Sequence, residues 1–202
     1  NYPYGTRLED ETISLNVPYI IDMHGVYESS TVSGTASAPS MDLISLNSSS
    51  TTTTELIIGE QLIGQNSNAI AIVAEKSDAD TITFIYQNDF TFNEGETVVF
   101  QESSVQGVVS TITESSFNIS DEFTFNNGQE NTFYNYGTIT RKPDFDAPAK
   151  QIKIYFESAY YDSTDTGDIT TVDSYKTFDY STEIQEVNGL ANSDMIDIRP
   201  RV

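Results

Sequence analysis

Cysteine and tryptophan are absent from the sequence, and histidine occurs once, as His24. Without cysteine the chain can form neither a disulfide nor a thiolate metal site, and it has no cysteine nucleophile. One histidine offers little to nucleophile-and-base catalysis near neutral pH, and no Gly-x-Ser-x-Gly turn accompanies it. We therefore interpret His24 as a structural residue, with Asp22 on the same strand face available to orient its ring.

Basic residues are also scarce, since nine Lys and Arg stand against 31 Asp and Glu, for a formal net charge of -22. Such a surface repels a phosphate backbone and anionic lipid, so we expect neither nucleic acid nor a membrane as a partner. No apolar run approaches the roughly 18 residues that a membrane helix requires. The acidity suits a salty habitat or solubility at high local density at least as well as a specific cation site.

The two ends of the sequence resemble cuts. The chain begins at Asn1 rather than at Met, without the basic-then-apolar order of a signal peptide, and it stops at Val202 directly after Arg199-Pro200-Arg201. We expect an ordered piece of a longer extracellular or virion protein.

What the chain does contain favours strands over helices. There are 12 Tyr and 11 Phe, and the β-branched residues Val, Ile and Thr are abundant. Apolar and polar residues alternate from residue 13 to 17, and no stretch shows a helical stripe over three turns, so helices should be short and peripheral. Further strands are predicted at residues 19–27, 41–46, 55–63, 69–74, 81–86, 97–101, 105–112, 133–141, 151–157 and 168–174.

These runs predict an all-β fold with two parts. Residues 1–54 and 116–202 would form an Ig-like β-sandwich, and residues 55–115 would form a small β-barrel inserted between its strands. The alternative is a tandem arrangement split near residue 116. The Ser/Thr tract at residues 47–54 is interpreted as a boundary, because a packed core has no need of it.

A short internal similarity lies inside the predicted barrel. Gly59-Glu60-Gln61-Leu62-Ile63, followed by Ser67, has the same spacing as Gly95-Glu96-Thr97-Val98-Val99, followed by Ser103. We expect the glycine to take a tight turn, the glutamate to cap it towards water, and the apolar pair to enter the core. A second similarity, between residues 90–95 and 123–128, has a different offset, so both are interpreted as recurring strand–turn chemistry rather than as duplication.

No cofactor, catalytic residue or transition-metal site is predicted. The only candidates for calcium are Asp162, Asp165 and Asp168, whose spacing differs from that of an EF-hand loop, so a solvated acidic turn is the simpler interpretation. A glycosidase needs two carboxylates, but with 31 acidic residues their pairing in the sequence carries no information. The lack of tryptophan for sugar stacking argues further against one, and we expect no enzymatic activity.

Tyrosines are the most interaction-prone residues, because each has a large apolar face and a polar tip. Because side chains alternate along a strand, some of the tyrosines that lie close together in the sequence should face the core, and others should face a neighbouring protein. The candidate interface residues are Tyr134, Tyr136, Tyr155, Tyr160 and Tyr161.

The C-terminal third carries a resemblance to a known family. Residues 125–136 (Phe-Asn-Asn-Gly-Gln-Glu-Asn-Thr-Phe-Tyr-Asn-Tyr), 139–143 (Ile-Thr-Arg-Lys-Pro), 147–148, 152–156 (Ile-Lys-Ile-Tyr-Phe), 167–168, 171–175 and 196–202 together resemble large virion structural proteins of contractile-tailed phages, particularly those of marine cyanobacteria. The resemblance covers residues 117–202 well, the predicted barrel loosely, and the first 50 residues only in general character. It implies a tail, baseplate or fibre-associated bacteriophage component, assembled in many copies, with no catalytic residues.

The sequence thus predicts a non-enzymatic structural module of a virion whose partners are other virion proteins or copies of itself. The alternative is an adhesin module of a fibre or cell surface that binds a receptor or a host surface glycan. A polysaccharide-degrading enzyme is a third hypothesis, for which no motif gives support.

Overall fold

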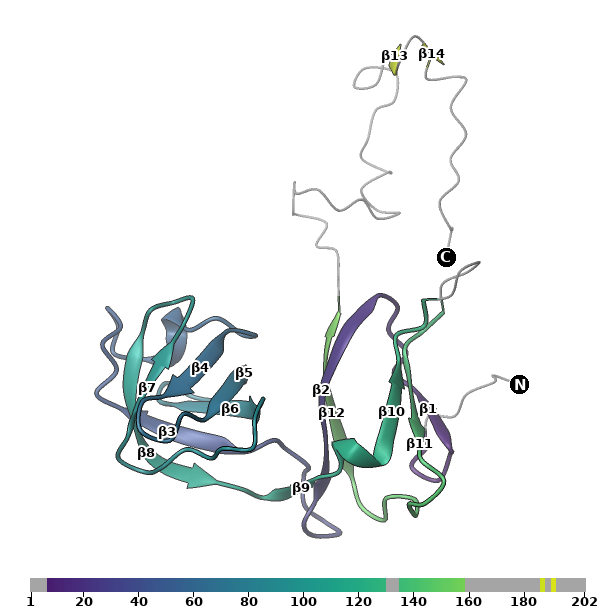
Figure 1. Ribbon diagram of the computed structural model, residues 1–202, viewed down its shortest axis with the longest axis horizontal. Helices are drawn as coiled ribbons and strands as arrows, with labels where there is room; N and C mark the ends of the chain where they lie inside the picture. Colours follow the sequence, from purple (N-terminus) through teal and green to yellow (C-terminus); the bar gives the residue numbers. More distant parts are fainter. Residues whose placement is uncertain (1–6, 130–134, 159–185, 188–189, 192–202) are drawn as a thin grey trace. The chain divides into compact units, whose positions relative to one another are not determined.

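The computed structural model describes residues 7–129, 135–158, 186–187 and 190–191 of the chain, and it is nearly all β (Figure 1). The prediction of an all-β fold is confirmed. The helices in this part of the chain are two short 3₁₀ turns, η1 (Thr53–Glu55) and η2 (Ser120–Glu122), and neither could cross a membrane. Residues 1–158 form one compact unit and residues 159–202 another, in which β13 (Glu186–Val187) pairs with β14 (Leu190–Ala191).

Two three-stranded antiparallel sheets form a sandwich in the first unit. One sheet has the order β1 (Thr12–Ser14), β11 (Thr138–Arg141), β10 (Phe123–Asn126), and the other has the order β12 (Ile152–Ser158), β2 (Ile20–Ser29), β9 (Ser116–Asn118). Both sheets contribute inward side chains to one buried cluster, made of Ile13, Val26, Ile119, Phe123 and Ile139. The alternating pattern of the sequence therefore produces the predicted sandwich.

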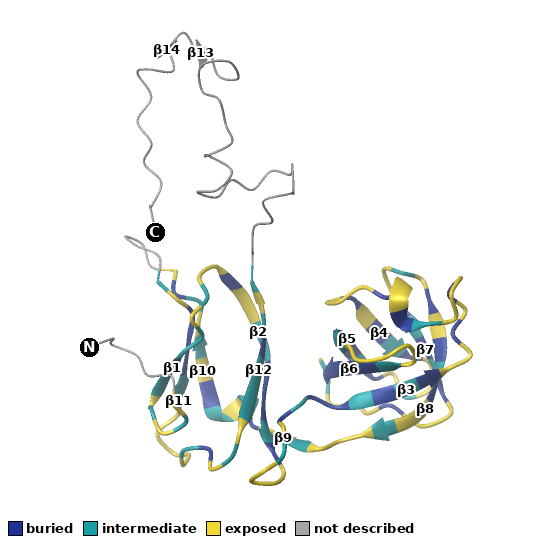
Figure 2. Cartoon of the chain, turned by 180° about the vertical axis from the view of Figure 1, so that it is seen from behind, coloured by how far each residue is buried: buried dark blue, intermediate teal, exposed yellow. Residues whose placement is uncertain are grey.

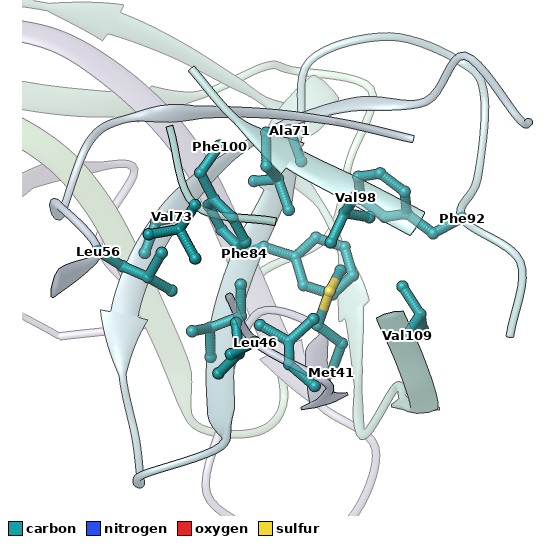
Figure 3. Packing of buried hydrophobic residues seen from close by; sticks show 14 of the residues in the cluster. Met41, Leu46, Leu56, Ala71, Val73, Phe84, Phe92, Val98, Phe100 and Val109 are labelled. Atoms are coloured by element: carbon teal, nitrogen blue, oxygen red, sulfur yellow. The ribbon is translucent and has the colours of Figure 1, made fainter. Parts of the chain in front are cut away.

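Six strands close into a barrel, again with antiparallel neighbours throughout. Their order is β3 (Ser40–Ile44), β6 (Thr81–Tyr86), β5 (Ile70–Lys76), β4 (Gln61–Gly64), β7 (Thr97–Phe100), β8 (Gln106–Thr113), and β8 pairs back with β3. Figure 3 shows the side chains that fill the interior, among them Met41, Phe84 and Phe100. Buried and more exposed residues alternate along β3, β4, β5, β7 and the first half of β8, as strand geometry requires, whereas residues 82–85 of β6 are all buried (Figure 2).

The barrel is inserted between sandwich strands. Strands β2 and β9 pair directly, with Tyr27 opposite Asn118, although the six barrel strands lie between them in the sequence. Strand β2 also pairs with β12, so strands on both sides of the barrel in the sequence complete the same sheet. This is the inserted arrangement rather than the tandem one.

The barrel begins earlier than the predicted residue 55, because β3 is one of its strands. Met41 and Leu43 of β3 are buried in the barrel core. The Ser/Thr tract therefore lies inside the barrel, in the connection from β3 to β4, and does not mark a boundary. Thr53 in this tract is buried, and its hydroxyl donates a 2.6 Å hydrogen bond to the backbone carbonyl of Asp78. Within the tract, the hydroxyl of Ser48 also donates to the backbone carbonyl of Thr52, and such hydrogen bonds satisfy the polar groups of a tract that carries no large apolar side chains.

Candidate interaction surfaces

The barrel consists of two equivalent halves, β3–β5 and β6–β8. Glycines at the same place in each half, Gly59 and Gly95, have positive φ angles of 92° and 84°, and the matching residues of β4 and β7 lie 36 positions apart. Ile63 pairs with its own counterpart Val99 across β4 and β7. A residue can face its own counterpart in this way only where a local two-fold axis passes between the strands. The similarity between residues 59–67 and 95–103 is therefore part of a structural repeat, and not only the recurring strand–turn chemistry expected from the sequence.

The strand pairing on the opposite side of the barrel follows the same two-fold symmetry. Strand β3 pairs with β6 with Met41 opposite Ile82, and the irregularities in the β3–β8 and β5–β6 pairings also correspond. The unpaired residue of the bulge is Ala74 in β5 and Ser110 in β8, again 36 positions later. Bulges are specific features of a strand pair, so their coincidence supports the repeat independently of the sequence.

The glutamate of each half is buried, and its carboxylate accepts hydrogen bonds from the other half. Oε1 of Glu60 accepts the backbone N–H of Ile57 at 2.6 Å, and its Oε2 accepts the N–H and the hydroxyl of Ser103, each at 3.0 Å. Ser103 lies in the β7–β8 turn, which belongs to the second half.

Glu96 makes the reciprocal contacts. Its Oε1 accepts the N–H of Asn93 at 2.6 Å, and Oε2 accepts the N–H of Ser67 at 3.0 Å, from the β4–β5 turn of the first half. The hydroxyl of Ser67 donates to the same carboxylate. Burial alone raises the pKa of Glu96, but the hydrogen bonds from Asn93, Ser67 and Asn66 outweigh it, so that the pKa lies below its ordinary value.

Both glutamates differ from the expectation that they cap their turns towards water, because Glu60 is 0% and Glu96 1% exposed. The physical reason is the supply of backbone donors, which offsets the cost of burying an ionised carboxylate. The signal was present in the sequence, since Ser67 and Ser103 recur at the same distance from the two glutamates.

An apolar contact joins the barrel to the sandwich. Tyr27 of β2 and Tyr155 of β12 cluster with Ala38 and with Ile85 on the outside of the barrel. The two rings meet edge to face with centroids 5.8 Å apart. Burial is the main cause that raises the pKa of Tyr27 to about 12, and the nearby Tyr155 and Glu114 raise it further. The hydroxyl of Tyr155 accepts the backbone N–H of Ala38 at 3.1 Å.

One ion pair accompanies this contact. Nζ of Lys153 on β12 lies 2.6 Å from the carboxylate of Glu75 on β5. Tyr155 was predicted as an interface residue, and it does lie at an interface, but that interface is within the chain.

A second outward surface of the barrel is poor in charge. The outward side chains of β4, β7 and the first part of β8, together with the last residue of β3, are apolar or neutral, and Asp42 of β3 borders them, in a chain with 31 acidic residues. Cross-strand pairing makes them contiguous, since Ile63 lies opposite Val99, Val99 opposite Gln106, and Val108 opposite both Thr97 and Ile44. We call this surface the neutral face and define it by Ile44, Ile63, Thr97, Val99, Gln106 and Val108.

The remaining predicted residues fall into two groups. Tyr136 precedes β11 and is exposed. The other candidates lie outside the described residues, namely Tyr134, Tyr160 and Tyr161 for an interface and Asp162, Asp165 and Asp168 for calcium, as does the predicted strand at residues 168–174.

His24 lies on β2 near two carboxylates. Its Nδ1 is 4.0 Å from Asp22 and its Nε2 is 3.8 Å from Glu157, as the shared strand face of His24 and Asp22 led us to expect. Within the part of the chain that the structure describes, no three His, Cys, Asp or Glu side chains form a group suited to a metal ion.

Comparisons of the chain with family models, with curated proteins and with solved structures found no match.

Proposed function

We propose that the chain is a non-enzymatic structural module of a virion, in a tail, baseplate or fibre, and that it acts by protein–protein contacts. The observation that carries this proposal is the junction of Tyr27, Tyr155 and Ile85, where one β module is fixed to another by buried rings and an aliphatic side chain. Aromatic contacts with one accompanying ion pair are typical of the joints in protein assemblies. The virion assignment comes from the resemblance of residues 117–202 to phage structural proteins.

The hydrogen bonding of the two buried carboxylates supports a structural role. Glu60 and Glu96 are the fully buried acidic residues of the described chain, and backbone N–H groups and serine hydroxyls occupy both oxygens of each. A general acid or base needs a free lone pair or proton that can reach a substrate. These two carboxylates are instead hydrogen-bonded within the barrel, where they tie its halves together.

The test is the composition of the particle. Particles purified by density gradient from a lysate in which this sequence is expressed should contain its peptides in mass spectrometry, in several copies per particle. Antibodies against the chain should label one defined part of the particle in electron microscopy. Peptides found only in the particle-free fraction would contradict the proposal.

A further inference from the structure

The barrel is attached to the sandwich by two crossings of the chain. Residues 30–39 lead from β2 to β3, and residues 114–115 lead back from β8 to β9 (Figure 1). The crossings start and end side by side, since Ser29 pairs with Ser116 at the sandwich and β3 pairs with β8 in the barrel. Relative motion is the default for two modules joined in this way, unless their interface is large and apolar.

The longer crossing is hydrogen-bonded to the sandwich through its backbone. Three consecutive N–H groups, at residues 36–38, donate to side-chain acceptors that stand on β9, on β12 or directly before β12. These bonds join Ala36 to Oε1 of Gln151 at 3.1 Å, Ser37 to Oγ of Ser116 at 3.0 Å, and Ala38 to Oη of Tyr155 at 3.1 Å. We call residues 36–38 and these three acceptors the latch.

The latch is buried, and it continues directly into the barrel. Ala36 and Ala38 are 1% and 2% exposed. The carbonyl of the next residue, Pro39, accepts the backbone N–H of Phe84 on β6 at 2.9 Å, and Phe84 belongs to the barrel core. Because a buried N–H without a partner costs free energy, the latch bonds are retained for as long as the segment stays buried. A continuous path of hydrogen bonds and backbone therefore leads from β12 to the centre of the barrel.

Tyr155 takes part in both the polar and the apolar contacts of the joint. Its hydroxyl accepts the N–H of Ala38, and its ring clusters with Ile85 on the outside of the barrel. Two positions earlier on β12, Lys153 pairs with Glu75 of β5 at 2.6 Å. The same sandwich strand thus contacts the wall of the barrel and the crossing that leads into it.

The repeat within the barrel shows how much this contact buries. It relates Ile85 of β6 to Ile44 of β3, because Met41 lies opposite Ile82 in the β3–β6 pairing. Ile85 is 1% exposed at the junction, whereas Ile44 is 53% exposed. The apolar contact therefore excludes water beside the latch, where hydrogen bonds are electrostatically stronger than they are in water.

We propose that the latch locks the barrel and the sandwich into one rigid body with a fixed angle between them. The inference deepens the proposed function and rests on it for its purpose, because neighbours bound to the two modules of a rigid chain are held in a fixed relation to each other. The apolar contact alone is small, so the three latch bonds are what prevents the barrel from turning about its two crossings.

The test is the distribution of distances between the two modules, measured by double electron–electron resonance on the complete 202-residue chain. The chain contains no cysteine, so Gln61→Cys on β4 and Thr124→Cys on β10 place one nitroxide label in each module. Both positions are exposed and lie on paired strands. The width of the distribution then reports how far the barrel moves relative to the sandwich.

Two variants and a matched control are made in this labelled chain. The latch-free variant combines Gln151→Ala, Ser116→Ala and Tyr155→Phe, and the second variant is Tyr155→Phe alone. Tyr86→Phe is the control, because the Tyr86 hydroxyl also accepts a backbone N–H, that of Phe92 at 3.2 Å, but does so within the barrel. Far-UV circular dichroism and the urea unfolding midpoint establish that each variant is folded.

We expect a single narrow maximum in the labelled wild type and in Tyr86→Phe. The latch-free variant should give a distribution at least about twofold broader, because two crossings and a small apolar contact leave the modules free to reorient. If that variant does not fold, Tyr155→Phe decides the matter through the same broadening. Tyr155→Phe and Tyr86→Phe should lower the unfolding midpoint by similar amounts, since each leaves one N–H without its acceptor. The distance distribution therefore separates a positioning role from a merely stabilising one.

A broad or two-peaked distribution in the labelled wild type overturns the inference, because the joint is then not rigid. A latch-free variant that stays as narrow as the wild type also overturns it, since other contacts then fix the angle. Equal broadening in Tyr86→Phe has the same consequence, because the effect is then not specific to the latch. A flexible joint in a chain that is found in purified particles leaves the proposed function standing, so that the two failures are distinguishable.

Discussion

Ser103 and Glu60 are joined twice, since Oε2 of the glutamate accepts both the backbone N–H and the hydroxyl of the serine, each at 3.0 Å. The pair connects the start of β4 to the turn between β7 and β8, and therefore crosses from one half of the barrel to the other. Ser67 and Glu96 make the same connection in the opposite direction. The barrel is thus fastened by two equivalent polar contacts in addition to its apolar core.

Replacing either buried glutamate by glutamine should destabilise the barrel by about 2–3 kcal/mol, because one acceptor oxygen becomes an NH₂ group that faces backbone N–H donors. Glu60→Gln and Glu96→Gln should cost similar amounts, since their surroundings match. The measurement is urea unfolding followed by far-UV circular dichroism. Glu102→Gln is the control, because it removes the same charge from an exposed side chain, and it should stay within about 0.5 kcal/mol of the wild type.

The contribution of Glu96 should depend on pH in a defined direction. Its folded-state pKa lies below the ordinary value of 4.5, so its stabilisation is complete above that pH and is lost as the pH falls through the lower, folded-state value. The stability difference between wild type and Glu96→Gln should therefore be constant from about pH 7 to 5 and shrink between about pH 4.5 and 3. Urea midpoints at four pH values measure it, and a difference that stays constant down to about pH 3 would contradict the assignment.

The two isoleucines related by the repeat should respond differently to truncation. Ile85→Ala leaves a cavity under Tyr27 and Tyr155 and should cost about 2–4 kcal/mol. Ile44→Ala removes the same atoms from an exposed position and should cost less than about 1 kcal/mol. Thermal unfolding of both variants measures the contrast, and equal losses would show that the junction does not bury Ile85.

The turn glycines should be equally sensitive. Gly59 and Gly95 have positive φ, and no atom lies within 4 Å of the place where a Cβ would project, so alanine would meet backbone strain without a steric clash. Gly59→Ala and Gly95→Ala should each cost about 1–2 kcal/mol. Asparagine tolerates positive φ better, so Gly59→Asn and Gly95→Asn are controls that should cost less. Clearly unequal alanine losses in urea unfolding would argue against equivalent turns.

Most strands could be predicted because alternation is a local property. The runs at residues 19–27, 81–86 and 151–157 correspond to β2, β6 and β12 within a few residues. The run from residue 55 failed at its start, since residues 53–55 form a 3₁₀ turn and the chain turns at Gly59 before β4 begins. Apolar Leu56, Ile57 and Ile58 resemble a strand locally, whereas the Glu60–Ile57 hydrogen bond closes a turn there.

By itself the sequence determined the all-β class, the acidic surface and the places where glycine permits a turn, because strand periodicity, charge and φ preference belong to single residues and their near neighbours. Only the tertiary structure decided that β3 belongs to the barrel, that Glu60 and Glu96 lie inside, and that Ile85 is covered while Ile44 is not. The alternation along a strand determines which side chains share a face, but segments distant in the sequence determine what packs against that face.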